Sequence, residues 1–161
     1  MKPVAIFLTF LLCKLEIGFS KEILLPLDSQ QEQCIEELKL DRDTMAYLSA
    51  QEFPPEDDQN FNEFFACTWK KQGYQFRNGQ LNYNALQRMI YNSLKEQAGA
   101  SRSALKLAKH MANTAVNECK NKGGNSHGQI AVKMQNCMYK ELLRIAEESR
   151  YVNNSENSKI W

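Results

Sequence analysis

Residues 62–81, NEFFACTWKKQGYQFRNGQL, combine a helical pattern with one cysteine and a helix stop. One face of a helix over residues 58–72 carries Phe61, Phe64, Phe65 and Trp69, which stand at positions i, i+3, i+4 and i+8. Gly73 ends this helix, because glycine readily adopts the left-handed conformation that follows a helix C-terminus. The stretch predicts a helix that buries an aromatic face and carries Cys67.

The residues before this stretch also follow a helical pattern. Ser29 and Glu32 have the spacing of a capping box at the start of a helix that carries Cys34. Asp43 is placed to cap a second short helix, which Pro54-Pro55 ends.

Three further helices are expected after residue 81. Asn82 is placed to cap the first, Ser101 or Ser103 opens the second, and Ser126 begins the last, which runs to about Ser149. The chain has no alternating β pattern of useful length. We therefore expect an all-α fold, a compact bundle of about six helices.

The chain divides into three parts. Residues 1–20 read as a secretory signal peptide, because an apolar run follows Lys2 and small residues stand at Gly18 and Ser20. Residues 21–150 form one helical domain, and residues 151–161 are an Asn- and Ser-rich tail. Asn153 begins a glycosylation sequon in that tail. We expect a secreted, extracellular protein.

Charge and motifs exclude several function classes. The mature chain is about neutral and lacks a basic stripe with interleaved aromatics, so nucleic acid is not expected as a partner. Membrane insertion is not expected either, because no apolar run reaches about 20 residues. No nucleophile elbow, phosphate loop or metal-spaced histidine pair appears, so we expect neither an enzyme nor a metal or cofactor.

Four cysteines remain after the signal peptide, at positions 34, 67, 119 and 137. An even number in an oxidising compartment favours two disulfides over free thiols or a zinc site. Three pairings are possible. An antiparallel hairpin around Gly123-Gly124 would bring Cys119 close to Cys137, and Cys34 would then pair with Cys67.

The cysteine spacing resembles that of the insect pheromone and general odorant-binding proteins. The resemblance covers residues 28–150 and matches Cys67 and Cys137 to the third and sixth of the six cysteines of that family. It matches Glu63 to the second cysteine and Gly128 to the fifth, which form a disulfide in the family. It therefore implies the pairs Cys34–Cys67 and Cys119–Cys137 and a four-cysteine, minus-C subclass. We expect a looser junction near Glu63 and Gly128, where the third disulfide is missing.

The resemblance also implies a closed apolar cavity between the helices and a carrier that binds odorant or pheromone-like ligands for transport in olfaction. Tyr47, Tyr83, Tyr91 and Tyr139 are candidates to orient a ligand through their hydroxyl groups. The expected lining is Leu48, Phe65, Trp69, Leu86, Met89, Ile90, Leu105, Ala108, Met111, Ala112, Ala115, Val116, Ile130, Met134 and Met138.

Two alternatives stay open. In the first, this chain is a salivary or haemolymph scavenger of the same fold, for example of amines. In the second, it is a signalling bundle with no cavity ligand. For the carrier, the expected partners are a small apolar ligand and a membrane receptor for the loaded protein. The carrier itself is expected to be a monomer or a weak homodimer.

Overall fold

The computed structural model describes residues 27–99 and 101–157, with side chains up to Ser149 apart from Ala98. The expected signal peptide lies outside the described residues, as do Cys13 and the last four residues of the tail. The described part is all-α, as predicted. Its helices are α2 (Ser29–Leu38), α3 (Arg42–Ser49), α4 (Gln59–Lys71), α5 (Tyr83–Ala98), α6 (Arg102–Cys119) and α7 (His127–Asn157).

The first two helices are capped by Asp28 and Asp41, not by the predicted Ser29 and Asp43. The Asp28 carboxylate accepts hydrogen bonds from the backbone N–H groups of Gln30 and Gln31, each at 2.8 Å. The Gln31 side chain accepts one from the Asp28 backbone N–H, which completes a capping box one residue before the expected one. This frame leaves Leu27 to pack on the apolar core between α2, α3, α4 and α7. Asp41, rather than Asp43, caps α3.

Helix α4 begins and ends as its sequence predicts. The Asp58 side chain accepts a hydrogen bond from the Phe61 backbone N–H at 2.8 Å. At the other end Gly73 adopts a positive φ of 77°. The N–H groups of Gly73 and Tyr74 donate to the carbonyls of Lys70 and Trp69, the two bonds of a Schellman motif.

Helix α7 is longer than expected. It starts where predicted, because the Gln129 N–H donates to the Ser126 hydroxyl at 3.0 Å. It continues to Asn157, so the expected end near Ser149 is wrong. Neither glycine nor proline interrupts residues 149–157, and polarity alone does not end a helix. Asn153 lies in this extension, and its side chain is outside the described part.

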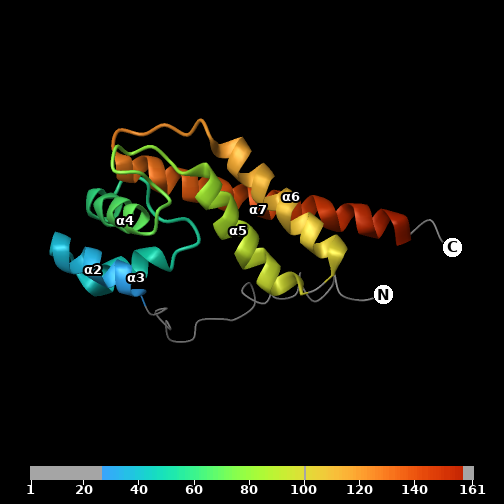
Figure 1. The fold of residues 1–161 in the computed structure, drawn as a ribbon, viewed down its shortest axis with the longest axis horizontal. Helices are drawn as coiled ribbons and strands as arrows, with labels where there is room; N and C mark the ends of the chain where they lie inside the picture. The colour runs from blue at the N-terminus through green and yellow to red at the C-terminus, as the bar shows by residue number, and fades with distance from the viewer. Residues whose placement is uncertain (1–26, 100, 158–161) are drawn as a thin grey trace.

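The long helix α7 runs along the length of the molecule (Figure 1). α2, α3 and α4 lie at one end of it, and the α5–α6 hairpin lies toward the other. The main contacts join α4 to α7 and α2, α5 to α6, and α6 to α7. Disulfides link Cys34 on α2 to Cys67 on α4, and Cys119 on α6 to Cys137 on α7. Both expected pairings are confirmed.

Two apolar clusters form the core. The hairpin cluster joins α4, α5, α6 and α7, and its fully buried members include Leu86, Val116 and Met134. The N-terminal cluster joins α2, α3, α4 and α7 around Phe61 and Phe64. Phe65 packs against both clusters, so α4 connects them.

Candidate functional site

The structure brings most of the expected lining residues into one place. Ten of the fifteen belong to the hairpin cluster or pack against it: Phe65, Trp69, Leu86, Met89, Ile90, Ala112, Ala115, Val116, Met134 and Met138. Leu48 packs instead against the N-terminal cluster. Ala108 and Met111 are buried outside both clusters, and Leu105 and Ile130 are half-buried.

The small residues of α6 allow close packing. α6 lies between α5 and α7 and contacts both. Ala108, Ala112 and Ala115 are at most 3% exposed, and the last two belong to the hairpin cluster. A single methyl side chain lets neighbouring helices approach, so these positions fill the core by proximity rather than by bulk.

The four candidate tyrosines separate into two groups. Tyr83 and Tyr91 pack against the hairpin cluster, and the Tyr83 hydroxyl donates to the Lys120 carbonyl at 3.0 Å. Tyr47 is 48% exposed. Tyr139 packs edge-on against Phe53, with 5.6 Å between the ring centroids, and therefore anchors the loop after α3. Only Tyr83 and Tyr91 lie where they can contact a ligand held in the hairpin cluster.

Two surface hollows flank the start of α7. A polar hollow of about 270 Å³ is lined by Asp57, Gln59, Asn62, Glu63, Asn125, Ser126 and Gln129. A second, of about 540 Å³, is lined by Asn78, Gly79, Gln80, Leu81, Tyr83, Lys122, His127 and Ile130. Of the fifteen expected lining residues, Ile130 alone borders either hollow. Leu81 and Tyr83, which pack against the hairpin cluster, also line the second hollow, so this hollow borders the cluster at its edge.

Comparison with known proteins decides the family. Residues 18–141 match the model of the PBP/GOBP family. The chain belongs to the PBP/GOBP family. The resemblance drawn from the cysteine spacing is thus confirmed at the level of the family.

A solved structure supports the fold of this PBP/GOBP chain. Odorant-binding protein dmelOBP28a from Drosophila melanogaster aligns with a TM-score of 0.52 and 20% sequence identity. The alignment covers 71% of this chain and 88% of the Drosophila chain. At that identity the likeness concerns the fold. No curated protein matches the chain.

The junction expected to be loose is closely packed. A Cβ atom on Gly128 would lie within 3.0 Å of the backbone O, C and Cα atoms of Asn62, so the α4 and α7 backbones are in contact there. Glu63, the neighbour of Asn62, is exposed and accepts a hydrogen bond from the Gln59 side chain at 3.2 Å. Glycine permits this approach, which a cysteine side chain would prevent. The looser junction itself stays a prediction, to be tested by ligand exchange.

Side-chain amides beside this junction hold the loop before α4. The Asn136 amide donates to the Pro54 carbonyl and to the Glu56 carboxylate, both at 3.0 Å. The Asn62 amide donates to the Glu56 carbonyl at 3.0 Å. Sequence reasoning missed this clamp. Asn136 is only 4% exposed, but Lys133 and Lys140 stand one turn before and after it, so no apolar stripe marks this position as buried in the sequence.

The described residues form neither a membrane-spanning helix nor a cluster that could bind a metal ion. None of their helices is both long and apolar enough to cross a bilayer. The same part of the chain holds no group of three or more His, Cys, Asp or Glu side chains placed to bind a metal ion.

Proposed function

We propose that this PBP/GOBP-family chain is a carrier that binds a small hydrophobic ligand within the hairpin cluster and solubilises it for transport. One observation carries the proposal: ten of the residues expected to line a ligand cavity meet in a single apolar cluster between four helices. Likeness of fold to a protein titled odorant-binding supports it. Leu48, Leu105, Ala108, Met111 and Ile130 have peripheral roles in this proposal.

Ligand access follows from the way the helices are held. The Cys119–Cys137 disulfide fixes the end of α6 to α7. The opposite end of the α5–α6 hairpin, near Gly99, has no disulfide among the described residues and is held by packing. Met89, Met134 and Met138 adapt to a ligand because their unbranched side chains rotate easily. Ligand burial contributes about 25 cal/mol per Å², before the costs of ordering.

The finer features of the expected carrier belong to the same proposal. The described part of the chain has two disulfides, and Gly128 touches the residue next to Glu63. This proximity supports reading positions 63 and 128 as the lost cysteine pair of a minus-C protein. A signal peptide over residues 1–20, an extracellular location and recognition of the loaded carrier by a membrane receptor complete the proposal.

A displacement experiment tests ligand binding. A fluorescent apolar probe, N-phenyl-1-naphthylamine, is titrated into the protein and then displaced with long-chain alcohols, esters or biogenic amines. Alcohols and esters are expected to displace it because they carry apolar chains. Ala112→Leu adds bulk to the hairpin cluster and should weaken probe binding at least tenfold, or about 1.4 kcal/mol, which corresponds to roughly two buried methylene groups.

Ala50→Leu is the matched control, because Ala50 is exposed and the substitution is the same. Probe affinity should not change in that variant, and thermal melting checks that both variants are folded. Absence of probe binding at micromolar protein would overturn the proposal and favour a signalling bundle. Displacement by amines but not by alcohols would favour the scavenger.

A further inference from the structure

Charge is strongly segregated along this nearly neutral chain. Residues 28–63 contain eleven acidic and two basic side chains. Residues 64–122 contain ten basic and two acidic side chains. Apart from Glu36-Glu37, Glu56-Asp57-Asp58 and Lys70-Lys71, like charges are separated by other residues, so the segregation shows only when long segments are compared.

The fold keeps the two sets of charges apart. The acidic segment forms α2, α3 and the start of α4, and we call this the acidic lobe. The basic segment from residue 73 to 122 forms α5, α6 and the adjoining turns, which we call the basic lobe. Figure 1 shows the acidic lobe at one end of α7 and the α5–α6 hairpin toward the other. The main contacts of α2 and α3 are with each other and with α4, not with the hairpin.

Both lobes present their charge to solvent. Eight carboxylates of the acidic lobe are exposed, as are all eight arginines and lysines of the basic lobe. Arg102, Lys106 and Lys109 recur at four- and three-residue steps, so they form one exposed stripe along α6. None of the basic lobe's arginines and lysines forms an ion pair within the described part of the chain.

We propose that the basic lobe docks on the acidic lobe of a second copy of this chain. The acidic lobe has eleven acidic and two basic side chains, a net charge of −9, and the basic lobe has eight basic and two acidic side chains, a net charge of +6. The lobes are therefore opposite in charge, and the net charge of the whole chain is only +1, so no net repulsion opposes the contact. An anionic surface such as a lipid bilayer would account for the basic lobe but leave the matching acidic lobe without a partner. This inference is independent of the proposed carrier function.

Sedimentation velocity at low and high salt tests the proposal. At 20 mM NaCl and protein near 0.5 mM, the sedimentation coefficient should rise with protein concentration. At 300 mM NaCl it should return to the monomer value, because exposed charges are screened within less than about 10 Å. A monomer at low salt overturns the proposal, and so does association that salt leaves unchanged.

Charge reversal identifies the surfaces. Lys106→Glu/Lys109→Glu reverses two charges of the basic lobe, and Glu36→Lys/Asp43→Lys reverses two of the acidic lobe. Each variant alone should associate at least tenfold more weakly than the native chain. An equimolar mixture of the two should regain association, because the unchanged acidic lobe of the first variant can dock on the unchanged basic lobe of the second. Failure of the mixture to associate overturns the proposal, and circular dichroism verifies that both variants are folded.

A flotation assay separates a lipid partner from a second copy. Vesicles of phosphatidylcholine with one-third phosphatidylserine are mixed with the protein at 20 mM NaCl. Flotation of a protein that sediments as a monomer would replace self-association with a lipid surface. Self-association without flotation supports the proposal.

Discussion

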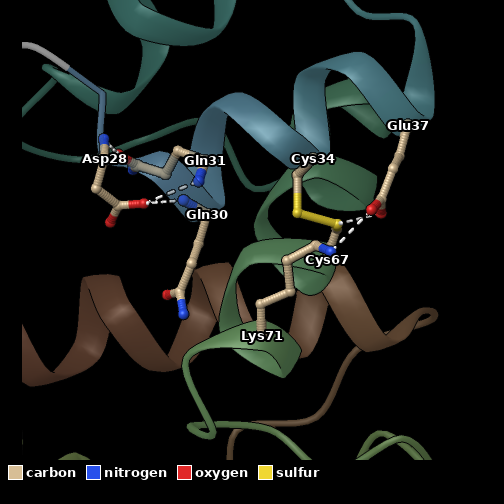
Figure 2. Close-up of a disulfide and its surroundings, with 7 residues drawn as sticks. All are labelled: Asp28, Gln30, Gln31, Cys34, Glu37, Cys67 and Lys71. Atoms are coloured by element: carbon tan, nitrogen blue, oxygen red, sulfur yellow. Dashed lines mark hydrogen bonds and ion pairs between the residues drawn. A yellow bond between two sulfur atoms is a disulfide. The ribbon is translucent and has the colours of Figure 1, made fainter.

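The α2–α4 pair and the α5–α6 hairpin are held together in different ways. Figure 2 shows the first pair, where the Cys34–Cys67 disulfide lies beside Glu37 and Lys71. The Lys71 ammonium group contacts the Glu37 carboxylate at 2.8 Å. The Gln72 side chain adds a hydrogen bond to Asp28 at 3.0 Å. Covalent, ionic and hydrogen bonds therefore all join these two helices.

The hairpin depends mainly on apolar packing. No disulfide joins α5 to α6. The one disulfide between α6 and α7 is formed by Cys119, the last residue of α6. The Tyr83 hydroxyl bonds the Lys120 carbonyl at that same end. The α2–α4 pair is therefore the more firmly tied of the two regions, and under the proposed function the end of the hairpin near Gly99 is where we expect a ligand to enter.

Removing the disulfides one at a time should have the largest effect on this contrast. The paired changes Cys34→Ala/Cys67→Ala and Cys119→Ala/Cys137→Ala open loops of 33 and 18 residues. Each should lower the free energy of unfolding by about 3–4 kcal/mol in the chain-entropy model, as urea denaturation can measure.

The two disulfide variants should differ in where the structure loosens. Loss of Cys119–Cys137 should speed amide hydrogen exchange in α5 and α6, because it removes the one covalent tie of the hairpin. Loss of Cys34–Cys67 should leave exchange in α5 and α6 nearly unchanged. Equal acceleration in both variants would contradict the distinction between the two regions.

Gly128→Ala should have the next largest effect, because it attacks the contact between α4 and α7. The new methyl group would overlap the Asn62 backbone, and overpacking of this kind typically costs about 1–3 kcal/mol. Gly123→Ala is the matched control, since a Cβ there meets no atom within 4 Å. Its unfolding free energy should change by less than about 0.5 kcal/mol. Equal midpoints in urea for the two variants would disprove close packing at Gly128.

Tyr139→Phe should have the smallest effect, and only at alkaline pH. Burial, helped by the Glu52 carboxylate, raises the pKa of Tyr139 above its ordinary value of 10.0. The folded state thus holds this proton more tightly than the unfolded chain, and the resulting stability is present below pH 10 and lost as pH rises through the raised pKa. Stability of the native chain should fall more steeply above pH 10 than that of the variant. Parallel stability curves in pH-dependent urea unfolding would refute the assignment.

Local sequence signals located most of the helices. The aromatic stripe and Gly73 predicted α4, and Asn82 and Ser126 predicted the starts of α5 and α7. These signals work because caps and apolar periodicity act over a few residues. The first capping box was misplaced by one residue, because two overlapping frames satisfy the same spacing and the packing of Leu27 agrees with only one of them.

The candidate site was predicted only in part. The apolar stripes identified the ten residues that meet in the hairpin cluster, since periodicity reveals which face of a helix is buried. It does not reveal whether facing stripes enclose a cavity or close on each other. Periodicity also does not reveal which cluster a residue joins. Leu48 lies on an apolar stripe, but it packs against the N-terminal cluster.

The sequence by itself determined the helices, the number of cysteines available for disulfides and the family of this chain. Those features depend on local spacing along the chain. The tertiary structure alone decided that Gly128 brings two helix backbones into contact and that oppositely charged segments lie in separate lobes. These features arise between residues far apart in sequence, where the distance between atoms, and not their order along the chain, sets the energy.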